Sequence, residues 1–422
     1  MVLRALITGG AVLAAAGTAA VELRYRRHPG NDLRFEDEGW QQERTGPGSL
    51  RMSGRLIVHN VIPHREVMLT DVGLEVRLLG DHDLDGVAVR TRVTSLRKDY
   101  PTRADGYWVS YVVKPASYAS PSPLEFEVDV TGPEAALDGL YGAWVEIRLD
   151  TYGFAATREQ FHHVVLPLRF PDPAEVVPWR EAADGRALVR TVRTHLLGPF
   201  DDPLEVVRRY ALPHARPGDI VTIGETPLAV IQGRFHDPRM MAMGWPATRL
   251  AQFMSGEGSL GTAGGMQALM NEHGTMRVIG ALAGGVAAKA VGKPGWFYRL
   301  AGPQARLVDD VTGTLPPYDK FIVVGPERAD EVCVRIAGGT GLAAAVVDAN
   351  NLGKVDVVGF SPATDLGLVC DALRANPAGN GDEGTPIVLI RPTGGPGDST
   401  GSNGSNSSNS SNSSNGSAAG DR

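Results

Sequence analysis

Two adjacent aspartates are the clearest candidates for metal chemistry in this sequence. Asp309 and Asp310 stand just before Thr312, Gly313 and Thr314, in a loop that leaves an apolar segment. Hard cations such as Mg²⁺ bind one or two carboxylates together with phosphate oxygens and water. The pattern favours a metal site at the two aspartates, with Thr312 and Gly313 beside a bound cofactor. A solvated turn or a helix cap is the alternative.

A third aspartate ends an apolar run. Residues 344–347 are Ala and Val, and Asp348 then begins the polar run Asp348-Ala-Asn-Asn-Leu-Gly353. Ligands in α/β folds bind beyond the carboxyl ends of the strands, so we expect Asp348 to be a further metal ligand. Asn350 can contact the cofactor through its side-chain amide, although it brings no charge.

A glycine-rich run is a candidate phosphate cradle. No G-x-x-x-x-G-K-[ST] occurs in the sequence, which excludes a P-loop NTPase. The run Gly256-Glu-Gly-Ser-Leu-Gly261 matches G-x-G-x-x-G only formally, because no clear strand precedes it. Gly258, Gly261 and Thr262 could instead present backbone N–H groups to an anion at the start of a helix. A tight turn between packed helices is the alternative.

Composition limits the classes of function. The 422 residues carry 41 Lys and Arg against 48 Asp and Glu, a formal net charge of −7. A dedicated nucleic-acid binder needs a positive field, which this balance does not supply. The two cysteines, Cys333 and Cys370, have no partners at metal-ligand spacing, which excludes a zinc cluster and a disulfide scaffold. The partner we expect is a small-molecule substrate.

An all-β module is expected at residues 45–172. Short segments of alternating apolar and polar residues recur there, most regularly at 87–93 and 124–130, and turn-forming residues separate them. About seven such segments indicate a β-sandwich of immunoglobulin-like size. His162 and His163 are adjacent, and neighbours in a strand face opposite sides, which argues against a shared metal.

A mixed α/β domain is expected at residues 186–392, after a polar linker at 180–185. The pattern predicts strands at 187–197, 220–223, 321–324, 344–348, 355–360 and 387–390, most of them apolar on both faces. Asp202 before Pro203 predicts a capped helix over 202–210.

The two ends of the chain read differently from these domains. Residues 5–21 carry no charge and precede Arg24, Arg26 and Arg27. We expect residues 1–28 to be a membrane anchor, with the body on the cytoplasmic side by the positive-inside rule. A cleaved signal peptide on an exported protein and a buried helix are the alternatives. Residues 393–422 are rich in Gly, Ser and Asn and are expected to be a disordered tail.

Several runs of the α/β region resemble the coenzyme F-420 γ-glutamyl ligases. They are Thr194-His-Leu-Leu-Gly-Pro-Phe-Asp-Asp202, Ala215-Arg-Pro-Gly-Asp-Ile-Val-Thr-Ile223, Gln232-Gly-Arg234 and Asn376-Pro-Ala-Gly-Asn380. The resemblance covers residues 186–392 and leaves out the β-module and the tail. It is closest to a divergent branch of that family.

The resemblance implies a reaction and a set of partners. GTP and Mg²⁺ or Mn²⁺ would support formation of an amide between a small-molecule carboxylate and an amino acid such as L-glutamate. Gln232 and Arg234 would then be catalytic, and the protein would form a homodimer. One departure is Glu225, which stands where the family pattern carries a cation. A catalytically inactive, membrane-tethered binding or scaffold protein on the same fold is therefore the alternative.

Overall fold

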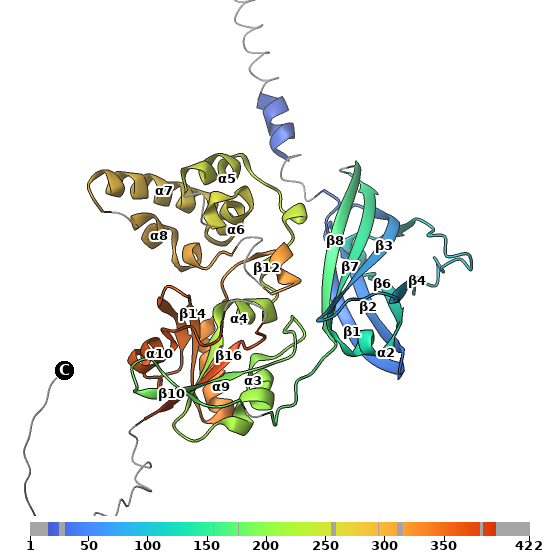
Figure 1. Ribbon diagram of the computed structural model, residues 1–422. Coiled ribbons are helices and arrows are strands. Elements are labelled where there is room, and N and C mark those ends of the chain that lie inside the picture. The colour runs from blue at the N-terminus through green and yellow to red at the C-terminus, as the bar shows by residue number, and fades with distance from the viewer. Residues whose placement is uncertain are drawn as a thin grey trace, which may run out of the picture.

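The computed structural model describes residues 16–24, 30–154, 156–175, 177–254, 259–293, 295–309, 315–379 and 383–393. It contains a β-sandwich, a mixed α/β domain and a small bundle of helices (Figure 1). The sandwich and the α/β domain agree with the fold class that the sequence predicts. The bundle, residues 241–306, is a separate layer that the pattern did not distinguish, and it is called the helical cap below.

The β-sandwich consists of two four-stranded antiparallel sheets, ordered β1-β2-β6-β4 and β5-β3-β7-β8. The strands are β1 (Leu33–Gly46), β2 (Ser49–Asn60), β3 (Val67–Gly80), β4 (Ala88–Ser95), β5 (Tyr111–Val113), β6 (Ser122–Thr131), β7 (Leu140–Gly153) and β8 (Ala156–Pro167). A one-turn 3-10 helix (Ala116–Tyr118) precedes β6, and the short helix α2 (Glu134–Asp138) joins β6 to β7.

Position in the sheet decides how well alternation predicts burial. In β6, Leu124, Phe126 and Val128 are fully buried and the residues between them face outward, as the pattern predicts. β4 alternates equally well in sequence, but most of it is exposed and Val89 is 37% exposed. It is the outer strand of its sheet, where one edge lacks a neighbour.

The α/β domain is built on a six-stranded mixed sheet, ordered β15-β14-β11-β16-β10-β9. Its strands are β9 (Arg180–Glu181), β10 (Ala187–Val192), β11 (Ile220–Gly224), β14 (Ala343–Ala349), β15 (Val355–Phe360) and β16 (Ile387–Pro392), and its helices are α3 (Pro203–Val206), α4 (Glu225–Ile231), α9 (Ala329–Thr340) and α10 (Leu366–Leu373). One face packs on α9 through Cys333 and Ile336, and the other packs on α10 through Leu368 and Val369. Burial on both faces explains why these strands are continuously apolar.

Two segments differ from their expected form. The predicted linker at 180–185 begins with β9, which pairs with β10 at the edge of the sheet. The strand predicted over 187–197 ends at Val192, because Thr194 and the residues after it turn away. The predicted helix does begin after Asp202, whose carboxylate accepts the N–H groups of Leu204 and Glu205. It continues from α3 as a π-helical turn (Val207–Ala211) and a 3-10 turn (Leu212–His214).

β11 and β14 are parallel neighbours, whereas the other adjacent strands of the sheet are antiparallel. Their carboxyl ends therefore meet at one edge of the sheet. α4 leaves β11 at this edge, and the polar turn at residues 350–353 leaves β14 there. The segment predicted as a strand over 321–324 is instead in a separate ladder, where β12 (Phe235–His236) pairs with β13 (Ile322–Val323).

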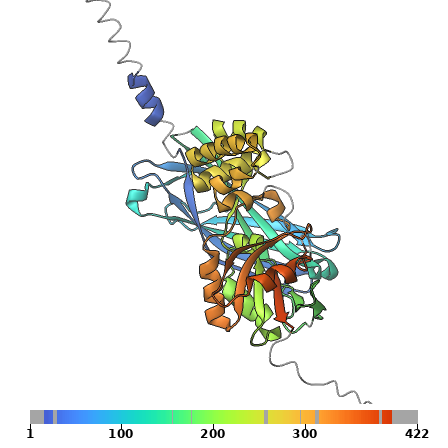
Figure 2. The ribbon, with the colours of Figure 1, turned by 90° about the vertical axis from the view of Figure 1, so that its left-hand side faces the viewer.

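The helical cap has a core of its own. It comprises α5 (Trp245–Leu250), α6 (Ala263–His273), α7 (Thr275–Ala290) and α8 (Trp296–Ala301), with 3-10 turns at Ala251–Phe253, Ser259–Gly261 and Pro303–Arg306. Met266, Leu269 and Phe297 are buried together there. Turned by 90°, the molecule again has the cap at one end, above the sheet domain (Figure 2).

The structure describes little of the expected anchor and of the expected tail. Residues 1–15, 25–29 and 394–422 lie outside the described residues, and so do most of the expected anchor (1–28) and of the expected tail (393–422). Residues 16–24 form an exposed helix. Within the described part of the chain, no helix combines the length and hydropathy needed to cross a membrane.

Candidate functional site

A cavity of about 510 Å³ opens at the carboxyl ends of β11 and β14. Its volume lies within the range of small-molecule sites. Acidic and amide side chains lie on its wall beside apolar ones. The wall includes Thr194, His195, Leu196, Leu197, Glu225, Thr226, Val230, Asp309, Leu315, Tyr318, Asp348, Asn350, Leu373, Asn376 and Pro386.

Glu225 is the most perturbed carboxyl group of this wall. It is the first residue of α4, directly after β11, and only 8% of it is exposed. Burial, together with the negative charges of the neighbouring aspartates Asp309, Asp348 and Asp356, raises its pKa to about 9. Within the part of the chain that the structure describes, no hydrogen bond or cationic side chain offsets these effects. A buried carboxylate without a counter-charge is costly, so this position favours either a proton or a bound cation.

Asp309 and Asp348 bring two more carboxylates to the cavity. Asp309 exchanges backbone hydrogen bonds with Val323, which fixes its segment beside β13. Burial raises the pKa of both aspartates; Asp348 raises that of Asp309, and Asp356 raises that of Asp348. The Thr226 hydroxyl donates a hydrogen bond of 3.3 Å to Oδ2 of Asp309 and partly offsets the shift.

Two asparagines shape the loops beside these carboxylates. Oδ1 of Asn350 accepts the backbone N–H groups of Leu352 and Lys354 at 3.0 and 3.1 Å, closing the turn after β14. Nδ2 of Asn376 donates to Oδ1 of Asn351 at 2.9 Å, which ties this turn to the loop after α10. Asn350 thus lies on the cavity wall, although its side-chain oxygen already accepts two hydrogen bonds from its own turn.

His195 also lines the cavity, and two side chains hold its ring. Its Nε2 lies 2.8 Å from Oδ1 of Asp201, and its Nδ1 lies 2.8 Å from the Tyr210 hydroxyl. Because a carboxylate only accepts, Nε2–H donates to Asp201, and in the neutral imidazole Nδ1 accepts from the Tyr210 hydroxyl. The other oxygen of Asp201 accepts the N–H of Gly198. The run Thr194–Asp202 that carries the family resemblance is therefore a loop folded around His195.

The predicted catalytic residues Gln232 and Arg234 do not reach this cavity. They follow the carboxyl end of α4, whereas Glu225 is at its amino end, and seven helical residues separate the two ends by about 10 Å. The Arg234 guanidinium instead donates to Glu272, Glu327 and the carbonyl oxygen of Gly325, at 2.5–2.6 Å. The Gln232 amide makes two hydrogen bonds with the backbone of Glu327. Both side chains hold α4 against its neighbours.

The predicted phosphate cradle is not on the cavity wall either. Gly261 and Thr262 belong to the helical cap, where the Thr262 hydroxyl accepts the N–H of Gly265 and caps its own helix. A Cβ atom on Gly265 would lie 2.2 Å from the carbonyl oxygen of Ser259, so this glycine permits close packing. The observed contacts match the alternative of a tight turn between helices.

Four of the predicted site residues lie outside the described residues. They are Gly258, Asp310, Thr312 and Gly313. Of the remaining ones, Asp309, Asp348 and Asn350 are brought together on one wall, while Gln232, Arg234, Gly261 and Thr262 are not.

A second cluster of metal-ligating residue types joins the β-sandwich to the α/β domain. Ligand atoms of Glu146, His163 and Asp237 lie within 4.8 Å of one another. Nε2 of His163 lies 2.9 Å from Asp237, and its Nδ1 accepts the Trp144 indole N–H at 3.2 Å. Arg239 donates to both carboxylates at 2.6 and 2.7 Å.

The guanidinium thus occupies the position of a cation in this cluster. Burial alone would raise the pKa of Asp237, but hydrogen bonds from His163 and Arg239 hold it well below its usual range. Trp144 also packs against Phe321, in a cluster that includes Tyr318 and Val230 of the cavity wall. The sandwich therefore backs one wall of the cavity.

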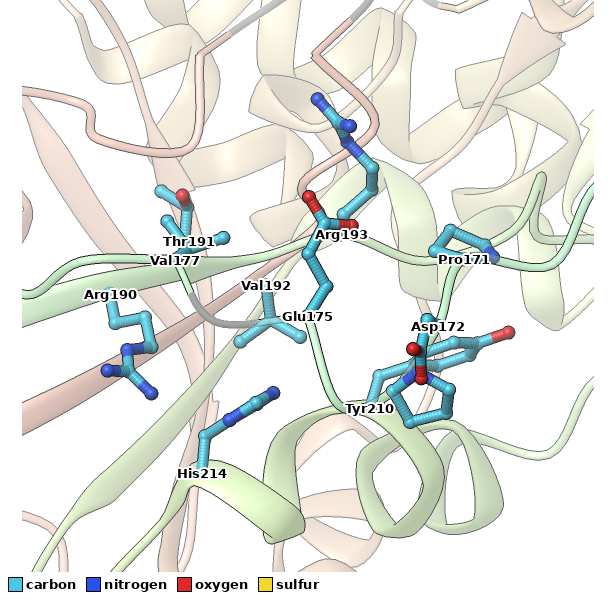
Figure 3. A pocket seen from close by; sticks show the side chains of 11 residues that line it. Pro171, Asp172, Glu175, Val177, Arg190, Thr191, Val192, Arg193, Tyr210 and His214 are labelled. Carbon is cyan, nitrogen blue, oxygen red and sulfur yellow. The ribbon is translucent and has the colours of Figure 1, made fainter.

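A separate cavity is too small for a substrate. It measures about 20 Å³, enough for one water molecule, and lies between the segment after β8 and β10 (Figure 3). Asp172, Glu175, Arg190, Tyr210 and His214 are among its lining side chains.

The chain thus combines an immunoglobulin-like β-sandwich with an α/β domain that carries an acidic cavity. Residues 34–170 match the family model described as F-420-0:gamma-glutamyl ligase, N-terminal Ig-like domain. The chain therefore contains a domain of that ligase family. The match falls on the β-module, which the motif resemblance over 186–392 had left out.

Solved structures add only weak likenesses. The GAE domain of GGA1 from yeast is 13% identical at a TM-score of 0.20 and covers 33% of this chain and 96% of that one. The GAE domain of GGA2p from Saccharomyces cerevisiae is 9% identical at a TM-score of 0.19, and the match covers 34% of this chain and 95% of that one. A protein from Archaeoglobus fulgidus is 8% identical at a TM-score of 0.18, and the match covers 31% of this chain and 95% of that one. No curated protein matches the chain.

Glu225 and His195 are the site residues that sequence reasoning missed as such. Glu225 stood out only as an acidic residue where the family pattern has a cation. His195 lies inside a quoted motif, which was the available signal. Asp237 is 74 positions from His163, so no local spacing could have paired them.

Proposed function

We propose that the chain is a ligase of the kind its Ig-like domain indicates. It would join the carboxylate of a small molecule to the amine of an amino acid such as L-glutamate, with GTP as the activating co-substrate. The matched domain at residues 34–170 and the motif runs of the α/β domain support this proposal.

The observation that carries the proposal is the meeting of three carboxylates on one cavity wall, the buried Glu225 and the half-buried Asp309 and Asp348. All three have raised pKa values. The described residues of the wall include no Lys or Arg. Phosphoryl transfer requires positive charge around the phosphate oxygens, so this site depends on a cation from outside the chain.

The donor set fits Mg²⁺ or Mn²⁺. Both ions prefer oxygen ligands, and Asp309, Asp348 and Glu225 would hold the ion, with Asn350 beside it. When bound, the ion supplies the charge that the γ-phosphate needs during transfer. Leu196, Leu197 and Tyr318 form an apolar part of the wall that would hold the body of the acid and exclude water.

The reaction is balanced without any further reactant. The terminal phosphoryl group of GTP passes to a carboxylate oxygen of the acid, and GDP leaves. The amine then attacks the acyl carbon, the C–N bond forms, the C–O bond to phosphate breaks, and phosphate is released with the amine proton.

The test is turnover by the full chain with Mn²⁺, GTP, L-glutamate and the deazaflavin acid. GDP release and the amide product are followed by chromatography and mass spectrometry. Asp348→Asn is expected to lower the rate by about 10²–10³-fold, the range for removal of one electrostatic group. Asp371→Asn is the matched control, because Asp371 pairs with Arg186 and Arg374 on the surface. No GDP and no amide from wild-type protein that binds Mn²⁺ would contradict the proposal.

A second function, binding without catalysis, is favoured by one observation. Glu225 puts a carboxylate where the family pattern carries a cation, and no described Lys or Arg replaces that charge on the wall. Metal-dependent binding of GTP with no turnover of any acid would support this second function.

A further inference from the structure

The helical cap exposes large apolar side chains to an unusual extent. Trp245 is 71% exposed, Phe253 66%, Met276 79% and Val291 72%. Single exposed apolar residues are normal on protein surfaces, but these four belong to one bundle, residues 241–306, of which 61 are described. Such a concentration indicates a surface that binds a partner.

α7 presents the most continuous part of this surface. Only Val278 and Ala281 of its 16 residues are buried. Exposed apolar and small residues recur along the helix at intervals of three or four, which places them on one face: Met276, Gly280, Ala283, Ala287 and Ala290. That face carries no charge. By the helical period Arg277 lies about 100° to one side of it, whereas Lys289 lies about 140° from its centre, near the buried Val278.

The cap is strongly basic, although the chain as a whole is acidic. Residues 241–306 include six cationic residues and two acidic ones, in a chain of formal net charge −7. All six cations are exposed: Arg249, Arg277, Lys289, Lys293, Arg299 and Arg306. None of them makes an ion pair among the described residues. Glu272, the acidic residue of the cap that is described, is paired with Arg234.

We propose that the helical cap lies on an anionic lipid surface. Helices with an uncharged apolar face, exposed Trp and Phe, and flanking Lys and Arg bind the interface of anionic membranes. Each Lys or Arg near such a surface adds about 1 kcal/mol of attraction. Charge also selects against a second copy of the chain, because two caps placed face to face would bring their unpaired cations together.

The arrangement leaves the cavity accessible. None of the residues that line the cavity belongs to the cap. In both views the helix at residues 16–24 lies at the same end of the molecule as the cap (Figures 1 and 2). Membrane contact by the cap is therefore compatible with substrate entry at the sheet edge. The proposal of membrane contact does not depend on whether the protein is a ligase.

The test places an environment-sensitive fluorophore at position 276. Met276→Cys is made in a Cys370→Ser background of the full chain, since Cys333 is fully buried. Val89→Cys in the same background, in the outer strand β4, is the control label. Each protein is mixed with vesicles of phosphatidylcholine alone or with equal parts of phosphatidylglycerol.

The expected result is a blue shift at position 276 with the anionic vesicles, weakened by about 0.5 M salt, and no change at position 89. Lys289→Glu with Lys293→Glu is expected to reduce the vesicle-bound fraction by about tenfold or more. Sedimentation with vesicles without a shift at position 276 would overturn the proposal, because other residues would then bind the lipid. A shift without vesicles that grows with protein concentration would also overturn it, in favour of a second copy.

Discussion

The Thr226 hydroxyl donates a hydrogen bond to Oδ2 of Asp309, which lies 83 positions later in the chain. Thr226 is in the first turn of α4, and Asp309 is bridged to Val323 beside β13. The bond fixes the Asp309 segment next to the buried Glu225. The fold thus brings acidic groups together where burial raises the pKa of each, and this cost is what a bound cation would relieve.

The raised pKa of Glu225 predicts that the stability of the metal-free protein depends on pH. The folded chain holds its proton up to about pH 9, whereas the unfolded chain releases it near the ordinary value of 4.5. Between these values the folded state binds more protons, so the free energy of unfolding falls as pH rises, by at most about 1.4 kcal/mol per pH unit. The contribution is complete below the lower value and lost above the higher one.

Urea unfolding in the presence of a chelator, at several pH values from about 5 to about 9, checks this prediction. Glu225→Gln is expected to flatten the decline, because its amide does not titrate. Part of the decline should remain, since the pKa values of Asp309 and Asp348 are raised as well. Equal slopes for the wild type and the variant would show that Glu225 is not held protonated.

Trp144→Ala should destabilise the junction between the sandwich and the α/β domain. The indole is 5% exposed and packs against Phe321 and His163. Loss of a buried Trp side chain lowers the free energy of unfolding by about 3–5 kcal/mol. Trp144 belongs to the same apolar cluster as Tyr318, which lines the cavity. Urea titration measures the loss. Trp296→Ala, at a position 37% exposed, is the matched change and should cost far less; similar losses would contradict the account.

Removal of Arg239 should turn the cluster at the junction into a zinc site. Glu146, His163 and Asp237 offer ligands within 4.8 Å, and the guanidinium now neutralises the two carboxylates. Arg239→Ala should therefore gain Zn²⁺ affinity, while the wild type binds Zn²⁺ weakly at this cluster. His163→Ala in the Arg239→Ala background should lose the gain. Tight Zn²⁺ binding by the wild type that His163→Ala abolishes would show that the guanidinium does not block the site.

Two glycines of the helical cap should respond to substitution in opposite directions. A Cβ at Gly265 would lie 2.2 Å from a backbone oxygen, whereas a Cβ at Gly280 meets nothing within 4 Å. Gly265→Ala is expected to lower the free energy of unfolding by about 1–3 kcal/mol through overpacking, and Gly280→Ala in α7 to raise it by up to about 1 kcal/mol. Thermal melts of both variants check this. A Gly265→Ala variant of normal stability would remove the packing explanation for the glycine-rich run.

The local pattern of apolar and polar residues predicted the helices and strands better than it predicted which of them contact one another. The alternation in β6 and the apolar runs of β11, β14 and β16 reflect burial, which each strand records in its own sequence. The Asp202 cap was visible because its partners are two and three positions away.

The site could be predicted only where a motif coincided with a strand end. Asp348 follows β14 at the parallel edge, and the rule for α/β sheets places it on the cavity wall. Arg234 lies away from this wall because the seven residues of α4 separate it from Glu225. Asp309 approaches through a bridge to Val323, a long-range pairing that sequence spacing does not encode.

The central claim is a cation site formed by Glu225, Asp309 and Asp348, and calorimetric titration of Mn²⁺ into the full chain tests it most directly. The account predicts one dominant binding event, weakened by at least about tenfold in Glu225→Gln, Asp309→Asn and Asp348→Asn and unchanged in Asp371→Asn. Circular dichroism of each variant establishes that it is folded. Mn²⁺ binding of equal strength in all of these proteins, or none in the folded wild type, would contradict the account.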